Sequence, residues 1–228
     1  MKRIITILAG LALLISCSKS DEVKHLENLN KELSTNISNL QSNLQIARKA
    51  QLKFQFLTNK LRGIKATIVT NHGDIEVKFD PKVAPLHVFS FVTRAESGFY
   101  DGTQFHRIMK GFMIQGGDSN SKKYPADFVR HGSGEPIVAI PHEFNSKKHL
   151  RGVLSTARNP DKSRGAGSQF FIMHAENSGL NNDYTAFGEV TKGMDVVDKI
   201  ASLPRVSVPR NPNHPKNPVI IKTIKVYR

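Results

Sequence analysis

The chain has 228 residues, 39% of them hydrophobic and 23% charged, which suits one globular domain plus additional segments. Its 33 basic and 19 acidic residues give a formal net charge of +14, a surplus that is common in proteins that meet nucleic acid or an anionic surface. The basic residues do not form one aromatic-studded groove motif of the kind that single-strand binders use, which argues against nucleic acid. The single cysteine excludes an internal disulfide.

Residues 1–16 have the features of an export signal. Two basic residues precede the apolar run 4–15, which is shorter than the roughly 20 residues of a transmembrane helix. The run ends in Leu-Ile-Ser-Cys, which resembles the bacterial lipobox, where the cysteine is lipidated and becomes the mature N-terminus. Cys17 is therefore expected to carry lipid, in preference to an ordinary secretory cleavage site with an incidental cysteine. Ser18, in place of aspartate, favours the outer membrane facing the periplasm, so the expected location is the cell envelope.

The next segment, residues 18–62, contains no glycine or proline and predicts a helical stalk. Heptads counted from Val23 place apolar residues at nine of the twelve core positions. One core position holds Val23, Asn30, Ile37, Leu44, Gln51 and Thr58, and the other holds Leu26, Leu33, Leu40, Ala47, Phe54 and Leu61. A helix over 23–61 would span roughly 57 Å and carry a coiled-coil seam. The flanking positions offer few interchain charge pairs. A homodimer through this helix, a single helix folded back on the domain and a partly ordered stalk therefore all remain open.

After the stalk, the pattern changes to the two-residue alternation of β-strands. Residues 64–70 and 75–79 predict a hairpin closed by an Asn-His-Gly-Asp turn. Helices are expected over 84–95, opened by Ala-Pro, and over 193–201. Short strands account for most of the remaining domain.

Two further stretches are expected to be irregular. Residues 119–136 predict a loop near the site, and both a plain surface insertion and a loop that tunes substrate choice remain open. Residues 204–218 contain five prolines and precede a last strand over 219–226.

The stretch from Phe105 to Asp118 is the most unusual part of the chain, because it places an arginine and a glutamine among large apolar residues. In a strand, Arg107 would point to one side and His106 and Ile108 to the other. A guanidinium with five donors is seldom buried without a partner. Periodicity alone leaves open a core arginine paired with a carboxylate and an arginine on an exposed strand face.

Three blocks of this domain resemble the cyclophilin family of peptidyl-prolyl cis-trans isomerases. The first block, residues 105–118, has the form F-H-R-x-x-x-G-F-M-x-Q-G-G-D, the second combines residues 152–157 with 167–172, and the third is 180–188. The resemblance covers about residues 64–228. It implies a mainly β fold, a closed antiparallel eight-stranded β-barrel capped by two α-helices, here preceded by the long N-terminal helix. Since side chains fill a barrel of this size, the site is expected on its outer surface.

The resemblance also implies residue roles. It makes Arg107 the catalytic residue, and it assigns substrate contacts to His106, Phe112, Met113, Gln115, Ala157, Arg158, Gln169, Phe171, Leu180 and Tyr184. Phe112, Met113, Phe171 and Leu180 match the family's proline pocket. Gln115 matches the residue that orients the arginine, and Ala157, Arg158 and Gln169 match the stretch that grips the residues before the proline.

Three positions depart from the family pattern. Arg158 replaces the usual asparagine, although its backbone can still make the contact. Tyr184 stands where animal members usually have histidine. Gly179 occupies the position where many members have the tryptophan that contributes to binding cyclosporin, so weak cyclosporin binding with retained isomerase activity is expected.

Rotation about a peptidyl-prolyl bond needs neither a metal nor a cofactor, and none is expected. The nine histidines are scattered and show no metal-binding spacing.

The expected domains are a signal peptide at 1–16, lipidated Cys17 with its stalk at 17–62, and an isomerase domain at 63–228. Expected partners are proline-containing polypeptides and the membrane. The leading hypothesis is an isomerase assisting folding in the bacterial envelope; a binding or scaffolding module without relevant turnover is the alternative, and attachment to anionic polymers a weaker one.

Overall fold

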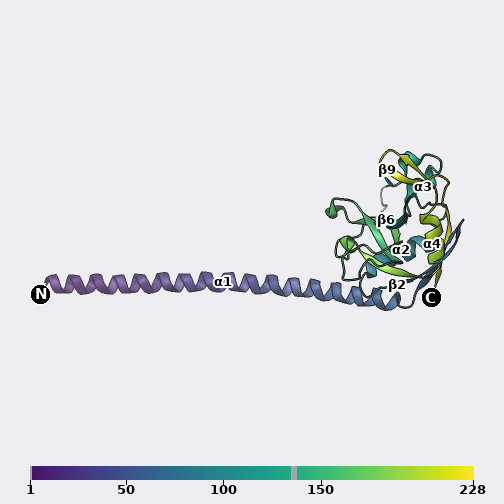
Figure 1. The fold of residues 1–228 in the computed structure, drawn as a ribbon. Helices are drawn as coiled ribbons and strands as arrows, with labels where there is room; N and C mark the ends of the chain where they lie inside the picture. Colours follow the sequence, from purple (N-terminus) through teal and green to yellow (C-terminus); the bar gives the residue numbers. More distant parts are fainter. Residues whose placement is uncertain (1, 135–137) are drawn as a thin grey trace. The chain divides into compact units, whose positions relative to one another are not determined.

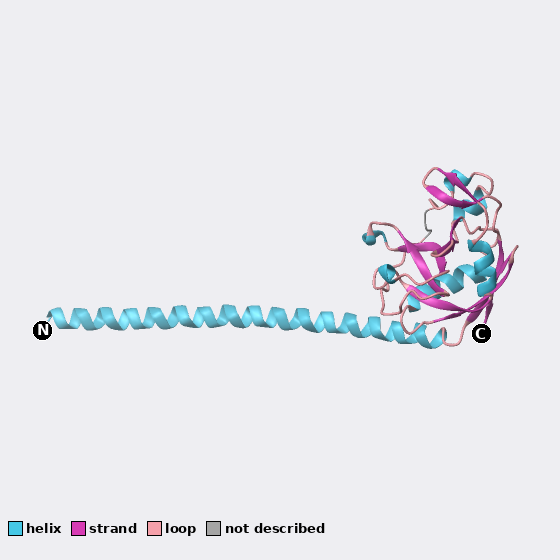
Figure 2. Ribbon diagram, in the orientation of Figure 1, coloured by secondary structure: helices cyan, strands magenta, loops and turns pink. Residues whose placement is uncertain are grey.

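The computed structural model describes residues 2–134 and 138–228, and the side chains from residue 22 onward. The chain forms two units, Met1–Lys53 and Phe54–Arg228. Figure 1 follows the elements along the sequence, and Figure 2 distinguishes helices from strands.

The first unit is helical throughout its described residues, as part of helix α1, Lys2–Lys60. The predicted seam residues Val23, Leu26, Leu33, Ile37, Leu40 and Leu44 are all exposed. No helix among the described residues has the length and apolarity needed to cross a bilayer. The division of the chain at residues 16 and 62, and pairing with a second copy, stay predictions.

The end of α1 belongs to the second unit, where it joins the hydrophobic core. Leu57 packs against that core, while Leu61 and the following Ile64 are buried in it. The Thr58 hydroxyl donates to the Pro81 carbonyl, with 3.1 Å between the oxygens. These contacts fix the point at which the helix gives way to the first strand.

The second unit is built on an eight-stranded antiparallel sheet with the order β10-β1-β2-β7-β5-β6-β4-β3. Its strands are β1 Lys65–Thr70, β2 Gly73–Phe79, β3 Arg107–Met109, β4 Met113–Gly116, β5 Val153–Arg158, β6 Ala166–Met173, β7 Ala186–Lys192 and β10 Ile221–Tyr227. Alternate residues face a core that includes Ile68, Ile75, Ile108, Leu154 and Ile172. The period of two in the sequence therefore determines which face of each strand is buried.

The sheet curls until its two edges approach each other. The strand order ends in β10 and β3, and just before these strands Gln104 and Ile220 form an isolated antiparallel bridge. The Phe105 N–H donates to the Val219 carbonyl at 2.8 Å, and the Ile221 N–H donates to the Thr103 carbonyl at 2.8 Å. A mainly β, curled antiparallel sheet preceded by a helix is thus confirmed. These hydrogen bonds and the isolated bridge join the two described edges without a continuous ladder between β10 and β3, so closure into a complete barrel stays a prediction.

Two helices lie where the sequence predicts them. Helix α2, Pro85–Glu96, packs against β10, β7 and β6 and buries Val88, Phe91 and Val92. Helix α4, Met194–Ala201, buries Val197, Ile200 and Ala201. Gly193 opens α4 at φ 91°, and a Cβ there would come within 2.3 Å of the Asp74 carbonyl oxygen, so only glycine fits.

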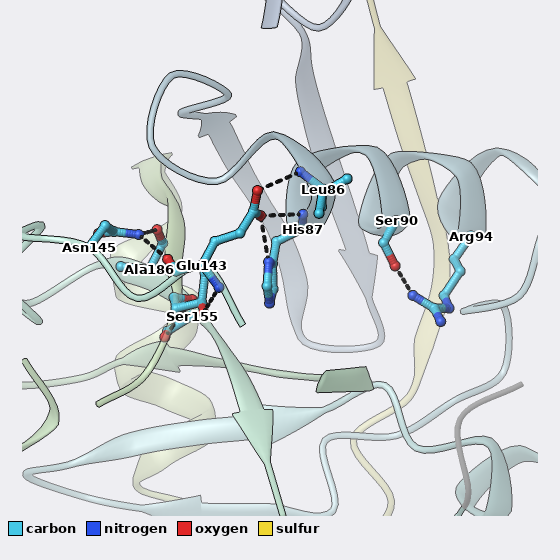
Figure 3. A network of polar contacts seen from close by, with 9 residues as sticks. Leu86, His87, Ser90, Arg94, Glu143, Asn145, Ser155 and Ala186 are labelled. Carbon is cyan, nitrogen blue, oxygen red and sulfur yellow. Dashed lines mark hydrogen bonds and ion pairs between the residues drawn. The ribbon is translucent and has the colours of Figure 1, made fainter. Parts of the chain in front are cut away.

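A carboxylate from a distant loop caps the N-terminus of α2. Ala84 at the N-cap provides no side-chain cap. Instead, the Glu143 carboxylate accepts the N–H of Leu86 at 3.1 Å and that of His87 at 2.9 Å, and it also accepts His87 Nδ1–H at 2.7 Å (Figure 3). These bonds satisfy donors that every helix start leaves without an intrahelical partner.

Both stretches expected to be irregular contain regular structure. Residues 119–134 include helix α3, Ser119–Lys123, and the 3₁₀ helix η1, Phe128–Arg130. Residues 135 and 136, the end of the expected loop, lie outside the described residues.

Within 204–218, strands β8, Arg205–Val208, and β9, Asn211–Pro215, form a separate two-stranded sheet. The prolines did not exclude a hairpin here, because a two-stranded sheet leaves one side of each strand unpaired. Two further 3₁₀ helices are η2, Lys162–Arg164, and η3, Ser178–Leu180.

Candidate active site

The site begins with the alternation of β3 and β4. Ile108 pairs with Ile114, which pairs with Ile172, and all three are fully buried in the core. One residue earlier on β3, Arg107 pairs with Gln115, which pairs with Phe171. Adjacent residues of a strand point to opposite faces, so the second row lies on the face turned away from the core.

On that outer face, a second hydrophobic cluster forms around Phe171. Its buried members are Met113, Val153, Phe171, Met173 and Ala186, and Met109, Phe112, Ala157, Leu180 and Tyr184 pack against them. The Phe171 and Tyr184 rings meet edge to face, with their centroids 5.8 Å apart. All four residues expected to seat the proline, Phe112, Met113, Phe171 and Leu180, belong to this cluster. The structure therefore brings them together on one apolar surface.

The Arg107 guanidinium lies beside this surface and is about half buried. Burial lowers the pKa of Arg107, and the nearby Tyr184 opposes that shift. Arg107 Nη1 donates to Gln115 Oε1 at 3.3 Å. Among the described residues, Gln115 is the hydrogen-bond partner recorded for this guanidinium, which leaves further donors for a bound substrate.

A chain of amide groups continues from Gln115. Gln115 Nε2 donates to Gln169 Oε1 at 3.0 Å, and Gln169 Nε2 donates to the Gly132 carbonyl at 3.1 Å. Gln115 and Gln169 are consequently fixed in orientation, with the Gln115 oxygen turned toward Arg107. The structure thus joins two of the expected binding residues to the expected catalytic residue by direct hydrogen bonds.

Ala157 and Arg158 lie where β5 departs from regular pairing. The register with β6 shifts between Thr156 and Arg158: β5 has one residue there, Ala157, and β6 has three, 167–169, so the extra residues belong to β6 and Ala157 lies opposite this irregularity. The Arg158 side chain turns to the 181–184 segment: Nε donates to the Asp183 carbonyl at 2.9 Å, Nη2 pairs with the Asp183 carboxylate, and the guanidinium carbon lies 4.6 Å from the Tyr184 ring centroid. Its side chain therefore stabilises the rim of the site, and only its backbone is left for a substrate.

His106 does not lie on the groove surface, contrary to expectation. It is 2% exposed, because alternation turns it away from Arg107. Burial, followed by the neighbouring His131 and His214, lowers the pKa of His106 to about 3, so its imidazole is neutral at physiological pH. His131 Nδ1 and His214 Nε2 are hydrogen-bonded at 2.9 Å in the same buried region. His106 supports the strand from behind.

Sequence reasoning also missed the residues that support the site. Behind Phe171, the buried His149 is 3.0 Å from the Ser155 hydroxyl through Nε2, and its ring lies 6.1 Å from that of Phe171. The Asp118 carboxylate accepts the N–H groups of Gly132 at 2.7 Å and Gly134 at 2.9 Å, and so holds the loop to which Gln169 is bonded. For the first group, Ser155 pairs with Phe171 across β5 and β6, and no local sequence pattern indicates this pairing. No local pattern pointed to the second.

The family described as cyclophilin type peptidyl-prolyl cis-trans isomerase/CLD matches residues 65–226. The chain belongs to the cyclophilin family. Among its relatives, peptidyl-prolyl cis-trans isomerase A of Dickeya dadantii is 37% identical over 166 residues, which cover 71% of this chain and 83% of the relative. Peptidyl-prolyl cis-trans isomerase B of Escherichia coli is 38% identical over 169 residues, 70% of this chain and 98% of the relative.

Solved cyclophilin structures agree with the fold. A cyclophilin type isomerase of Cryptosporidium parvum, determined in the presence of the dipeptide Ala-Pro, matches with a TM-score of 0.63 and 29% identity, covering 72% of this chain and 99% of the other. Membership in the cyclophilin family makes this chain a peptidyl-prolyl cis-trans isomerase. In the part of the chain that the structure describes, no group of three or more metal-ligating side chains is placed to hold a metal ion.

Proposed function

We propose that the outer-face groove catalyses rotation about X-Pro bonds in polypeptides, with Arg107 as the catalytic residue. The barrier of about 18–20 kcal/mol arises because the amide nitrogen shares its lone pair with the carbonyl. At the transition state the bond is twisted and that lone pair returns to nitrogen. A site that binds the twisted amide better than either planar isomer therefore accelerates the exchange.

One observation carries this proposal: the half-buried Arg107 guanidinium shares a cross-strand row with Phe171, at the edge of an apolar cluster. The cluster provides a seat for the proline ring. A guanidinium beside it can donate to the prolyl nitrogen once the lone pair is released, and that hydrogen bond is unavailable in the planar amide. Because the cation is partly desolvated and already oriented, its interaction with the transition state is strong and requires little reorganisation.

The neighbouring residues have positioning roles in this proposal. The Gln115 oxygen orients Arg107, and the Gln115–Gln169–Gly132 chain holds that oxygen in place. Ala157, at the register shift between β5 and β6, offers backbone groups to the residues before the proline. The solved relative determined in the presence of Ala-Pro supports a proline-containing peptide as the ligand class.

The test is a peptide isomerisation assay that compares the wild-type protein, Arg107→Ala and Arg107→Lys. We expect kcat/KM to fall about 100-fold or more for Arg107→Ala, the scale seen when a preorganised transition-state donor is removed. Arg107→Lys retains the charge without the planar fork and should recover only part of the activity. Equal rates for the wild-type and Arg107→Ala proteins would overturn the catalytic role. Peptide binding without turnover would favour the scaffolding alternative.

We also propose that lipid on Cys17 anchors the protein in the bacterial cell envelope, at the outer membrane facing the periplasm, where it assists folding of proline-containing clients. The apolar run that ends at the lipobox-like Leu-Ile-Ser-Cys supports this proposal. Cells expressing wild-type protein or Cys17→Ser would be labelled with palmitate and separated into membrane fractions. Label that persists in Cys17→Ser, or wild-type protein found only in the cytosol, would contradict it.

The exposed heptad seam of α1 supports a homodimer as the form of the anchored protein. Val23, Ile37 and Leu44 at one core position, with leucines at the other, favour a parallel pair. Light scattering of protein lacking residues 1–16 tests this directly. A mass that matches a dimer and falls to that of a monomer in Leu33→Lys is the expected result, and a monomeric starting protein would refute it.

A further inference from the structure

Two buried histidines adjoin the loop that supports the site. His131 follows η1 and is 5% exposed, and His214 lies on β9 and is fully buried. His131 Nδ1 and His214 Nε2 face each other at 2.9 Å. Because both rings are closed off from water, each of their nitrogens depends on neighbouring protein groups for its hydrogen bond.

The outer nitrogen of each ring contacts a backbone carbonyl. His131 Nε2 is 2.9 Å from the Tyr124 oxygen, and His214 Nδ1 is 2.8 Å from the Pro215 oxygen. A carbonyl oxygen only accepts hydrogen bonds, so both of these nitrogens carry a proton. Each ring has then used the single proton that a neutral imidazole holds on its nitrogens.

The two inner nitrogens therefore need a third proton. Without it, His131 Nδ1 and His214 Nε2 would present lone pairs to each other at 2.9 Å, which is repulsive for two acceptors. With it, one ring donates to the other, and all three contacts are satisfied at once. The observed distances thus describe a pair of rings with three protons and a net charge of +1.

The surroundings of this histidine pair favour one positive charge and oppose a second. The Phe128 ring stacks on His214 with 4.1 Å between the centroids, a contact that favours a cation. Burial raises the pKa of the Asp118 carboxyl, and the nearby His131 opposes that shift. Burial lowers the pKa of His214, and the like charge of His131 adds to the shift, so both rings are not charged together.

Other titratable groups surround the histidine pair. Burial lowers the pKa of His106 to about 3, and His131 and His214 add to the shift, so the His106 ring stays neutral. Arg107, next to it on β3, points to the opposite face. The charged residues of α3, of η1 with its N-cap and of the β8–β9 hairpin are exposed, and they are Lys122, Lys123, Asp127, Arg130, Arg205 and Arg210. The third proton of the pair therefore titrates apart from these groups.

The histidine pair is connected to the hydrogen-bond chain of the site. His131 directly precedes Gly132, whose carbonyl accepts Gln169 Nε2 at 3.1 Å. That chain continues through Gln115 to the Arg107 guanidinium. When the His131 ring is bonded at both nitrogens, the backbone next to it is held, and the carbonyl keeps its place for Gln169.

We propose that His131 and His214 bind one proton between their facing nitrogens and thereby act as positioning residues for the isomerase site. This inference rests on the proposed isomerase function. When the proton leaves, one of the three contacts of the pair is lost, and the Gly132 carbonyl is held less firmly. The Arg107 guanidinium is then less well oriented, so the site is more active on the acidic side of the pH range in which histidine titrates.

The first experiment counts these protons by NMR on the full chain, labelled with ¹⁵N in histidine. Nitrogen chemical shifts distinguish a protonated ring nitrogen from a bare one. At about pH 5.5 we expect three protons on the two rings, and at about pH 8 we expect two. Any other number at the acidic pH, or no change between the two pH values, overturns the proposal.

The second experiment measures kcat at the same two pH values on a capped Ala-Ala-Pro-Phe peptide, by NMR exchange without a coupling protease. Arginine does not titrate in this range, and rotation about the X-Pro bond transfers no proton, so the reaction itself supplies no pH dependence. We expect kcat to be about threefold higher at the acidic pH, the scale of one weakened hydrogen bond.

Two variants of His214 separate the shared proton from packing. His214→Phe keeps a ring against Phe128 but removes both nitrogens, so kcat should be low and independent of pH. His214→Gln offers His131 Nδ1 an amide N–H that does not titrate, so the higher kcat should persist at about pH 8. His142→Phe is the matched control and should keep the wild-type profile. It makes the same exchange at a histidine that stacks on Phe144, with 4.7 Å between the centroids.

The outcomes separate this inference from the proposed function. A wild-type kcat that does not change with pH, or equally low values in His214→Phe and His214→Gln, overturns the positioning role and leaves the isomerase function standing. Loss of the pH dependence in His142→Phe also overturns the positioning role. Absence of turnover at every pH overturns the proposed function and the positioning role together, while the NMR experiment still decides the shared proton. Thermal unfolding of the three variants checks that the fold is intact.

Discussion

Ile114 and Gln115 are consecutive residues of β4 that serve different parts of the molecule. Ile114 lies between Ile108 and Ile172 in the core, whereas Gln115 lies between Arg107 and Phe171 on the outer face. The same three strands therefore supply both rows, displaced by one residue. This comparison shows that the core fixes the strand register and that the register places the guanidinium beside the apolar cluster.

The largest effect is expected from a substitution in the core row, which consists of Ile108, Ile114 and Ile172. Ile114→Ala removes a fully buried side chain and leaves a cavity, so the free energy of unfolding should fall by about 3 kcal/mol. Ile114→Val, which removes one methylene, should cost about 1 kcal/mol. Denaturant unfolding measures both values. A loss below about 1 kcal/mol for Ile114→Ala would contradict the assignment of this row to the core.

The next prediction concerns His106, which faces away from Arg107. Its pKa of about 3 in the folded state lies below the ordinary value of 6.5, so the unfolded chain binds more protons between these pH values. The contribution of His106 to the free energy of unfolding is therefore fully present above about pH 6.5. It decreases as the pH falls toward 3, by about 1.4 kcal/mol per pH unit for one proton.

Unfolding curves from pH 8 to 4 test this slope in wild-type protein, His106→Gln and His25→Gln. The difference between wild type and His106→Gln should shrink as the solution is acidified, because the variant lacks the titrating group. His25 lies in the exposed stalk, and its replacement should leave the slope unchanged. Parallel curves for wild type and His106→Gln would refute the buried neutral imidazole.

A smaller effect is expected from Gln115→Ala, a substitution in the outer row, which consists of Arg107, Gln115 and Phe171. The variant removes the acceptor that orients Arg107 and the donor to Gln169, so kcat should fall about tenfold. Because Gln115 does not belong to either hydrophobic cluster, the free energy of unfolding should change by less than about 1 kcal/mol. A normal kcat, or a stability loss as large as that of Ile114→Ala, would remove the distinction between the two rows.

The smallest effect concerns the rim of the outer face. Gly179 is exposed in η3 and has a backbone conformation that other residues can adopt. Gly179→Trp should strengthen inhibition by cyclosporin about fivefold, by adding apolar area beside Leu180. Isomerisation without inhibitor should not change. Gly179→Ala is the control, and tight inhibition of the wild-type protein would contradict the expectation.

The difference between the core row and the outer row also explains which features could be predicted from the sequence. Period-two alternation indicated the strands and put Arg107 opposite Ile108, and the family resemblance assigned the outer row to the site. The same alternation turns His106 inward, a consequence that the assignment by resemblance overlooked. Local pattern thus fixed the face of each residue, while the resemblance identified which face matters.

Contacts between distant segments could not be predicted in this way. The Glu143 cap joins α2 to a loop more than 50 residues later, and the Asp118 bonds to Gly132 and Gly134 depend on how a short helix and a loop fold together. The β8–β9 hairpin could not be predicted because its segment is rich in proline. Only the folded structure shows that the two strands pair with each other. Each of these features requires knowledge of which segments meet.

The Glu143 carboxylate gives this protein a built-in spectroscopic reporter. Because it binds the amide hydrogens of Leu86 and His87, deuterium can enter these two positions only when the 143 loop detaches or the helix start frays. Their exchange rates therefore time the excursions of a segment 57 and 56 residues away in the chain.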